Sequence, residues 1–364
     1  MVTVRVAFPE RGSAAYDVLI GHGLLQELPI LLTSHCPAAR YVVITDAEVE
    51  RLYGRKAAAR IDAEVFSFPA GEAHKTRETW AQLTDRMLAA GVGRDAAVVA
   101  LGGGVAGDVG GFVAATYLRG IPCVQVPTTV LAMIDSSIGG KTGVDVPAGK
   151  NLVGAIRQPR LVVTDLDCVN SLPPAQFASG IAEAVKHGVI ADPEYLAFLE
   201  RDAAAILARR DAALERLVAR SVEIKAAIVA TDEHEAGVRA ALNFGHTVGH
   251  AVEAASGFSL LHGEAVAIGM VYEARLGEAL GITASGLAAQ ITALVEKFGL
   301  PVLRPGSASV DQLLKHMRSD KKVRAAEIRF ALPRRVGEMH VEARGAATIA
   351  APEALVREIL AGRQ

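Results

Sequence analysis

Three histidines and one glutamate have the types and the spacing that could bind a divalent metal ion. His246 and His250 are one turn apart in a segment expected to be helical, so both side chains would lie on one face. His262 begins the next helical segment, and Glu183 lies upstream with Lys186 three residues later. Neutral imidazoles with one carboxylate are the ligands of a catalytic zinc ion that keeps a position open for substrate. The H-E-x-x-H pattern is absent, however, and a single histidine is more often a packed or surface residue than a ligand.

A glycine-rich turn follows an expected strand at 97–101 and leads into an expected helix. A strand that enters a helix through glycines presents backbone N–H groups, which suit a pyrophosphate. Residues 102–107 match G-x-G-x-x-G, but the ordinary fingerprint lies on the first strand with an acid about 20 residues later. Residues 109–134 contain no Asp or Glu. The turn is therefore either a phosphate site of another kind or a purely structural turn.

A second glycine-rich stretch, residues 135–151, carries two lysines. Gly140-Lys141-Thr142 looks like the end of a nucleotide-triphosphate loop, but that motif requires glycine where this chain has Asp135. We expect flexible backbone here, with Lys141 and Lys150 available to a multiply anionic ligand. An exposed loop with solvated charges is the alternative.

Length and charge set the limits of the interpretation. The 364 residues, 51% of them hydrophobic, suit two packed domains. Because 38 Lys and Arg balance 40 Asp and Glu, we expect no attraction to nucleic acid or to membranes. Cys36, Cys123 and Cys168 form no C-x-x-C pair, which indicates a reducing cytoplasm. Without a leader or an apolar run of about 18 residues, we expect a cytoplasmic protein with no membrane span.

The order of the expected elements predicts a fold of class α/β plus all-α. Short β-branched runs at 41–45, 65–68, 97–101, 121–126 and 161–164 alternate with helical stretches, as in a parallel sheet wrapped by helices. Later segments at 202–230, 245–256, 263–280 and 286–298 indicate helices, and 328–332 and 339–341 are strand candidates. We therefore expect a Rossmann-like parallel-sheet domain at 1–170 and a mainly helical domain at 171–364.

Seven motifs, taken together and in order, closely resemble the 3-dehydroquinate synthase family of sugar-phosphate cyclases. The likeness runs from about residue 16 to residue 332 and carries the motifs GGGVAGD at 102–108, PTT at 127–129, DSSIGGKTG at 135–143, GKN at 149–151, AEAVK at 182–186, LNFGHTVGH at 242–250 and LHGE at 261–264. The resemblance implies a dehydroquinate synthase-like fold, with NAD bound by domain 1–170 and metal and substrate bound by domain 171–364.

The resemblance also assigns residues to the cofactors. It implies that Glu183, His246 and His262 bind Zn²⁺ or Co²⁺, which leaves His250 on the substrate side. The implied NAD contacts are Glu72, Lys75, Gly103, Gly104, Val105, Ala106, Gly107, Asp108, Thr128, Thr129, Lys141, Lys150, Cys168, Val169, Asn170 and Ser171. Two cofactor-side positions depart from the family pattern: Ala70 replaces a frequent Asp, and residues 169–171 replace a more usual Leu-Lys-Thr.

For the substrate, the resemblance implies 3-deoxy-D-arabino-heptulosonate 7-phosphate, converted to 3-dehydroquinate and phosphate in the shikimate pathway of aromatic amino-acid biosynthesis. The implied catalytic and substrate contacts are Arg119, Asp135, Lys141, Asn151, Lys186, Lys225, Arg239, Asn243 and His250, with one of Lys321 and Lys322. The resemblance implies a reaction in which NAD would take hydride from C5 and return it, the metal would lower the pKa of the C5 hydroxyl, and phosphate elimination would precede an aldol ring closure. We expect such a carbon–oxygen lyase to be a homodimer with its site between the two domains.

Three alternatives remain. A cyclase making deoxy-inosose or valiolone-type products would share the site, although Arg239, Asn243 and His250 fit a substrate with a carboxylate. A metal-dependent polyol dehydrogenase would release NADH, but it would leave buried cations such as Lys141 and Lys225 without an anion. A catalytically inactive binding protein would be expected to have lost metal ligands.

Overall fold

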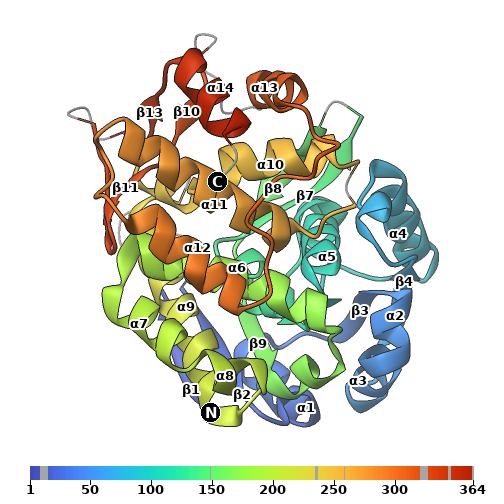
Figure 1. Ribbon diagram of the computed structural model, residues 1–364. Coiled ribbons are helices and arrows are strands. Elements are labelled where there is room, and N and C mark those ends of the chain that lie inside the picture. Colours follow the sequence, from blue (N-terminus) through green and yellow to red (C-terminus); the bar gives the residue numbers. More distant parts are fainter. Residues whose placement is uncertain are drawn as a thin grey trace. The chain divides into compact units, whose positions relative to one another are not determined.

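The computed structural model describes residues 1–8, 15–147, 149–233, 237–257, 259–319, 327–342 and 346–362 (Figure 1). The chain forms two compact units, Met1–Leu172 (unit 1) and Pro173–Gln364 (unit 2). Each unit contains its own clusters of buried apolar side chains. Within the described ranges, no helix is long and apolar enough to span a membrane.

Unit 1 is built on a seven-stranded sheet with the order β1-β2-β9-β6-β5-β3-β4. β1 pairs antiparallel with β2, and all other neighbouring strands are parallel. The strands are β1 (Val2–Val6), β2 (Tyr16–Gly21), β3 (Arg40–Asp46), β4 (Glu64–Phe68), β5 (Ala96–Gly102), β6 (Cys123–Pro127) and β9 (Leu161–Asp165). The five strands expected from the sequence are β3, β4, β5, β6 and β9, so the predicted parallel sheet is confirmed.

Strands β1 and β2 lie outside the predicted set. Val2, Val4 and Val6 alternate with Thr3 and Arg5, and Val4 and Val6 are buried while the two polar residues are exposed. That period of two is the signature of a half-buried strand at the edge of a sheet. The signal was therefore present in the sequence.

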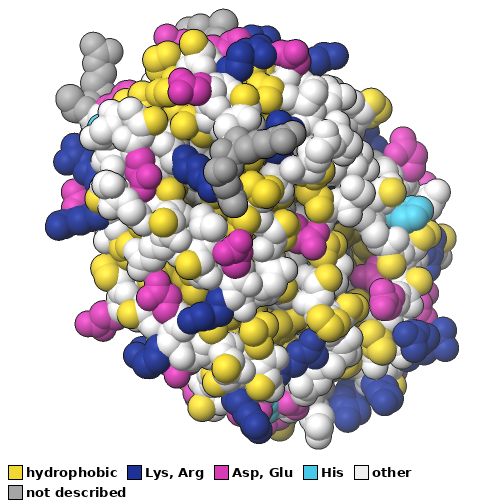
Figure 2. Space-filling model, in the orientation of Figure 1, with side chains coloured by type: hydrophobic (Ala, Val, Ile, Leu, Met, Phe, Trp, Pro, Cys, Tyr) yellow, Lys and Arg dark blue, Asp and Glu magenta, His cyan; other side chains and the backbone are white. Residues whose placement is uncertain are grey.

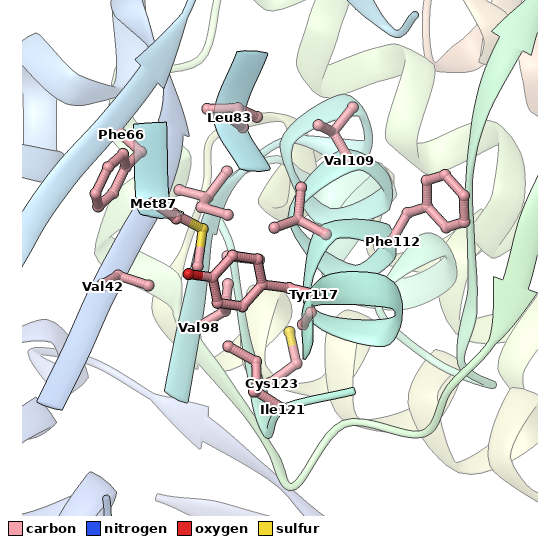
Figure 3. Packing of buried hydrophobic residues seen from close by; sticks show 14 of the residues in the cluster. Val42, Phe66, Leu83, Met87, Val98, Val109, Phe112, Tyr117, Ile121 and Cys123 are labelled. Carbon is pink, nitrogen blue, oxygen red and sulfur yellow. The ribbon is translucent and has the colours of Figure 1, made fainter. Parts of the chain in front are cut away.

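Helices cover both faces of the sheet, which explains why all seven residues of β5 are buried. Figure 3 shows one side of this core, where Val42, Phe66 and Val98 of the strands pack with Met87 and Val109 of the helices. The helical elements of unit 1 are α1 (Leu24–His35), α2 (Ala47–Val49), η1 (Glu50–Gly54), α3 (Arg55–Arg60), η2 (Glu72–His74), α4 (Arg77–Ala89), α5 (Gly104–Thr116), η3 (Tyr117–Arg119), η4 (Ala132–Ser136) and η5 (Leu166–Ser171).

The expectation of flexible backbone across 135–151 is wrong for much of that stretch. It contains β7 (Lys141–Val146), which pairs antiparallel with β8 (Gly149–Ile156). Glycines make the pairing close: a Cβ on Gly154 would lie 2.1 Å from the carbonyl oxygen of Thr142. The glycines of the motif therefore serve close approach of two strands rather than a mobile loop.

Unit 2 is mainly helical, as predicted. Its elements are α6 (Pro174–Ala191), α7 (Pro193–Arg201), α8 (Ala203–Leu207), α9 (Asp211–Thr231), η6 (Val238–Asn243), α10 (His246–Ala255), α11 (His262–Ala279), α12 (Leu287–Lys297), α13 (Val310–Ser319), β10 (Arg329–Phe330), β11 (Pro333–Arg335), β12 (Glu338–Met339), β13 (Ile349–Ala350) and α14 (Glu353–Ala361). The single helix expected at 202–230 is instead α8 and α9. Arg209 lies between them with φ 54°, and a left-handed residue of this kind ends a helix.

Charged side chains are spread over the face shown in Figure 2, where Lys and Arg are interspersed with Asp and Glu. This agrees with the formal net charge of −2. Any strongly charged site must therefore be built locally.

Candidate active site

Glu183 lies in the middle of α6 with its side chain fully buried. Helices α7, α9, α11 and α12 pack against α6, which explains why residues 179–190 are all buried. The ammonium group of Lys186, one turn along, contacts Glu183 Oε2. Burial raises the pKa of Glu183, but Lys186 and His262 lower it by more, so the carboxylate stays ionised. The sequence therefore places a fixed negative charge inside a helical core.

Two histidines from other helices face this carboxylate. His246 is the first residue of α10 and His262 is the first residue of α11. The Nε2 atom of each lies 3.5 Å from Glu183 Oε1, and their ring centroids are 5.4 Å apart. Ligand atoms of all three residues lie within 4.8 Å of one another, which is close enough to hold one metal ion. The predicted convergence of these three helices is thus found.

The hydrogen bonds around the histidines fit a metal site. His246 Nδ1 lies 3.1 Å from the carbonyl oxygen of Phe244, which can only accept, so Nδ1 carries the proton and Nε2 carries the lone pair. His262 Nδ1 lies 3.5 Å from Glu253 Oε2. In the described part of the chain, Glu183 Oε1 makes no hydrogen bond. Both imidazoles therefore point metal-binding nitrogens at an oxygen that a cation would satisfy.

Charge balance also favours a metal ion beside Glu183 and His262. Burial lowers the pKa of His262, but Glu183 and Glu253 raise it by more, to about 9. The imidazolium then neutralises part of the negative charge of the two carboxylates. A divalent metal at this position would replace that proton, because the metal binds the neutral ring.

Close helix packing brings the ligands together. A Cβ added to Gly263 would lie 1.8 Å from the carbonyl oxygen of Ser179, and one added to Gly269 would lie 1.8 Å from that of Gly245. Only glycine allows α11 to approach α6 and the start of α10 at these points. Figure 1 shows α10 and α11 side by side within unit 2.

His250 lies beside both histidines, with ring centroids 5.2 Å from His246 and 6.0 Å from His262. His250, Glu253 and His262 form a second group whose ligand atoms lie within 4.8 Å of one another. The second group shares His262 with the first, so a single metal ion would bind to only one of the two groups. Glu253 was not among the predicted site residues, although its position three residues after His250 was a signal in the sequence.

Buried cations gather in the same unit. Lys186, Lys225 and Arg239 are 1%, 6% and 2% exposed, and their elements α6, α9 and η6 pack against one another. Arg239 Nη1 donates to the carbonyl oxygen of Glu233 at 2.5 Å. Asn243 ends η6 and is half-buried. Buried cations that lie together would stabilise a bound anion.

In unit 1, the glycine turn lies where the order in which the chain adds strands to the sheet reverses. The chain moves outward from β3 to β4 and then crosses back to β5, so the carboxyl ends of β3 and β5 form a topological switch point. Gly102 has φ 152° and leads into α5. The amide of Thr128, after β6, donates to Gly102 O at 2.9 Å, and Thr129 Cγ2 lies next to Gly103. The two predicted cofactor segments therefore meet at the carboxyl ends of β5 and β6.

A second cluster of predicted cofactor residues lies in the same unit. Lys75 Nζ lies 2.6 Å from Asp108 Oδ2 and 4.0 Å from Glu72 Oε1, and Lys150 Nζ lies 3.2 Å from the same Glu72 atom. Asp145 was not predicted, yet its Oδ1 accepts the amide of Asn151 at 2.8 Å. Burial raises the pKa of Asp145. Thus β7 and β8 are linked by charge and hydrogen bonds to the 72–76 segment.

Two predicted substrate residues adopt unusual backbone angles. Arg119 and Asn151 have φ of 69° and 53°. Left-handed backbone is unfavourable for residues other than glycine and is often found at functional sites. In the sequence, Asp135 comes four residues before Gly139 and Lys141 two residues after it. The amide of Gly139 donates to Tyr16 Oη at 3.1 Å.

The predicted cofactor segment 168–171 is the C-terminal part of η5. Cys168 is fully buried, and its carbonyl accepts hydrogen bonds from Tyr53 Oη and Ser171 Oγ. Burial raises the pKa of the Cys168 thiol, with Asp165 and Asp167 adding to the effect. Of this segment, Asn170 and Ser171 are exposed. Lys321 and Lys322 lie outside the described residues.

Asp46, which ends β3 at the switch point, was not among the residues predicted from the sequence. Its Oδ1 accepts the amides of Glu48 and Val49, and a Cβ on Gly102 would lie 3.5 Å from its Oδ2. An acid directly after an expected strand was the available signal.

Two family models together match most of the chain. Residues 65–179 match the family model of the 3-dehydroquinate synthase N-terminal domain, and residues 180–323 match that of the C-terminal domain. The chain belongs to the 3-dehydroquinate synthase family. A 3-dehydroquinate synthase from Symbiobacterium thermophilum is 49% identical over 91% of this chain and 95% of that protein. One from Methylococcus capsulatus is 45% identical over 93% and 94%.

Solved structures place the 3-dehydroquinate synthase family among related cyclases. A 2-deoxy-scyllo-inosose synthase complexed with carbaglucose-6-phosphate, NAD⁺ and Co²⁺ has a TM-score of 0.89 at 28% identity, over 99% of each chain. The 2-epi-5-epi-valiolone synthase of Streptomyces hygroscopicus, with NAD⁺ and Zn²⁺ bound, has 0.85 at 29%, over 96% of this chain and 97% of that one. A probable glycerol dehydrogenase from Sinorhizobium meliloti, at 16% identity, TM-score 0.65 and 94% of each chain, shares the fold alone.

Proposed function

We propose that this chain converts 3-deoxy-D-arabino-heptulosonate 7-phosphate into 3-dehydroquinate and phosphate, with NAD used catalytically and a divalent metal ion. Membership of the 3-dehydroquinate synthase family supports the reaction. The structural observation that carries the proposal is the convergence of Glu183, His246 and His262 from three helices. These positions are also the metal ligands that the family resemblance implied.

The metal ligands would be Glu183 Oε1 and the Nε2 atoms of His246 and His262. One carboxylate and two imidazoles leave a fourth position for substrate on a tetrahedral zinc ion. The same ligands accept cobalt, and the structural relatives contain Co²⁺ or Zn²⁺. We choose this set over His250, Glu253 and His262 because Glu183 is fully buried and its Oε1 faces two Nε2 atoms.

NAD would bind to unit 1 at the switch point of the sheet. The N-terminus of α5 and the glycine turn before it suit the pyrophosphate. Glu72, Lys75, Asp108 and Lys150 form the charged cluster beside this turn. The remaining cofactor contacts would be Gly103 to Gly107, Thr128, Thr129, Lys141 and residues 168–171.

The substrate carries a carboxylate and a phosphate, so it needs several cations. Unit 2 would supply the cations Lys186, Lys225 and Arg239, with Asn243 and His250 as further contacts. Unit 1 would supply the cations Arg119 and Lys141, with Asp135 and Asn151 as further contacts. The left-handed backbone of Arg119 and Asn151 supports a functional assignment of these two residues.

The chemistry divides into cofactor steps and residue roles. When bound, NAD accepts hydride from C5 and returns it, and the metal lowers the pKa of the C5 hydroxyl. The residues hold and orient the substrate: buried Lys and Arg groups neutralise its two anions, and His250 lies one turn from His246 on the substrate side. The phosphate group of the substrate would remove the C6 proton as it leaves. His250 would therefore need only to hold this phosphate group, rather than to act as a strong base.

Phosphate release tests this proposal. The protein is incubated with NAD, Co²⁺ and the heptulosonate phosphate, and inorganic phosphate is measured over time. We expect multiple turnovers per chain and formation of 3-dehydroquinate. A second cyclase activity deserves a parallel assay, because the 2-deoxy-scyllo-inosose synthase structure has a TM-score of 0.89. Phosphate release from glucose 6-phosphate, but not from the heptulosonate phosphate, would overturn the proposal in favour of that activity.

Two further properties follow from the family resemblance. We propose a homodimer in the cytoplasm. Light scattering on the purified protein, at concentrations that span the micromolar range, measures the oligomeric state directly.

A further inference from the structure

Glu273 is a buried acidic residue that none of the catalytic roles uses. It lies on α11, is 0% exposed, and faces the first turn of α10. Its Oε2 accepts the amide of Gly245 at 2.7 Å, and its Oε1 accepts the amide of Val248 at 2.9 Å. The first residue of α10, His246, lies between these two amides in the sequence. Glu273 thus holds the backbone on both sides of a proposed metal ligand.

The start of α10 needs such a partner. The first four amides of a helix have no acceptor within the helix, and a side chain at the N-cap usually supplies one. Here the N-cap is Gly245, with φ 81°, and it makes no side-chain cap hydrogen bond. A carboxylate from the neighbouring helix takes that role, and its negative charge is also favourable at the positive end of the helix dipole.

Close packing against α11 fixes the position of α10. A Cβ on Gly249 would lie 3.0 Å from the carbonyl oxygen of Ala265, so the two helices are in close backbone contact. The imidazole of His246 is also held through Nδ1 by Phe244 O. Glu273, Gly249 and Phe244 together fix where the His246 ring can lie. A shift of the first turn would move Nε2 away from Glu183.

We propose that Glu273 is a positioning residue for the metal site: it anchors the first turn of α10 and thereby holds His246 Nε2 toward Glu183. The inference rests on the proposed function, because it assumes that His246 binds metal. Glu273 touches neither the metal nor the substrate in this assignment. It acts through the backbone of Gly245 and Val248.

The same helix offers a matched control. Glu278, also on α11, accepts the amide of Ala288 with Oε1 at 3.0 Å, near the start of α12. As with Glu273, a carboxylate of α11 accepts an amide at the start of a neighbouring helix, but Glu278 is half-buried and α12 carries none of the proposed ligands. If Glu273 has only a capping role, replacing either glutamate should have the same kind of effect.

The test compares Glu273→Gln with Glu278→Gln. Glutamine keeps the volume and one acceptor but turns an N–H₂ group toward a backbone N–H. Each protein is loaded with Co²⁺, its visible absorption spectrum is recorded, and its Co²⁺ affinity is measured by competition with a chelator, at a temperature where circular dichroism shows a folded protein. We expect Glu273→Gln to bind Co²⁺ about 10 to 100 times more weakly with a changed spectrum, and Glu278→Gln to match the wild type. Equal affinity and identical spectra in all three proteins would overturn the proposal.

Wild type and Glu183→Gln separate this inference from the proposed function. Wild type should bind one Co²⁺ per chain, and Glu183→Gln should lose it; if wild type binds none, the proposed metal site fails. If Glu273→Gln does not fold, Glu273→Asp replaces it, since it keeps the charge but is one methylene shorter. We expect intermediate Co²⁺ affinity for Glu273→Asp, and wild-type affinity would contradict a positioning role.

Discussion

Lys75 Nζ lies 2.6 Å from Asp108 Oδ2, and only 5% of the lysine side chain is exposed. Burial alone would lower the pKa of Lys75, but Asp108 and Glu72 raise it by more, so the ammonium stays charged. The pair joins the segment after β4 to the first turns of α5, where the glycine turn leads. Its stability therefore affects the geometry of the proposed NAD site.

Removing one charge of this pair should destabilise the protein without any cofactor present. We expect Asp108→Asn to lower the free energy of unfolding by about 3 kcal/mol, because a buried ammonium loses its nearest partner. Urea unfolding of the cofactor-free protein measures it. Asp17→Asn is the control: Asp17 pairs with Arg5, whose side chain is 59% exposed, and its loss should cost less than about 1 kcal/mol. Equal losses would show that burial of Lys75 has no energetic role.

Single replacements of histidine distinguish the two candidate ligand sets. His246→Ala should abolish metal binding and phosphate release together, whereas His250→Ala should keep the metal and slow the reaction. Metal content by atomic emission, on protein dialysed against a weak chelator, gives the answer. If His250→Ala loses the metal and His246→Ala keeps it, the ion binds to His250, Glu253 and His262 instead. His262→Ala should lose the metal in either case.

Gly263 tests the close packing of α11 on α6. A Cβ there would meet the carbonyl oxygen of Ser179 at 1.8 Å, so Gly263→Ala must push α11 away. We expect a loss of about 3 kcal/mol in stability and weaker metal binding, because His262 is the residue before it. Gly306→Ala is the control, since a Cβ at Gly306 meets nothing within 4 Å. Thermal unfolding and Co²⁺ titration of both variants should separate them; similar results would argue against the packing.

Asp192 gives a prediction for pH. It accepts the amide of Tyr195 at 3.0 Å as the N-cap of α7, and Arg220 Nε at 2.6 Å. Burial raises its pKa, but these two interactions lower it by more. A lowered folded pKa means that the stabilisation is present above about pH 4, the ordinary value, and is lost as pH falls through the folded pKa.

The variant Asp192→Asn isolates this charge, because asparagine still caps a helix. We expect a loss of about 1 kcal/mol at neutral pH, since Arg220 is half-exposed, and a difference from wild type that shrinks below about pH 4. Asp192→Ala removes the cap as well and should lose about 1 kcal/mol more. Denaturation followed across pH would contradict the assignment if the Asn variant differed from wild type equally at all pH values.

Much of unit 1 could be predicted because its buried strands are continuous apolar runs, as at 97–101, and their alternation with helices has few solutions. Strands β7 and β8 could not, since Lys141, Gly143 and Gly154 suggest a loop when each is considered locally. Their pairing depends on two backbones meeting where glycines leave room. Residue propensity alone does not contain that information.

The site was predictable in part for a similar reason. The types and local spacing of Glu183, His246, His250 and His262 indicated a metal, but only the resemblance chose His246 and His262 over His250 as the two imidazole ligands. Asp46 and Glu253 had local signals that were not used, namely the end of a strand and the spacing from His250, whereas the role of Glu273 depends on a neighbouring helix. Glu273, for example, caps a helix that begins 27 residues before it.

The central claim is that NAD is a recycled cofactor in a phosphate-eliminating cyclisation, and substoichiometric NAD tests it most directly. The protein is incubated with Co²⁺, the heptulosonate phosphate and about one-tenth as much NAD as substrate, while phosphate and NADH are followed together. We predict that nearly all the substrate releases phosphate and that no NADH accumulates. Formation of NADH equal to the NAD supplied, with no phosphate released, would contradict the account and indicate a polyol dehydrogenase.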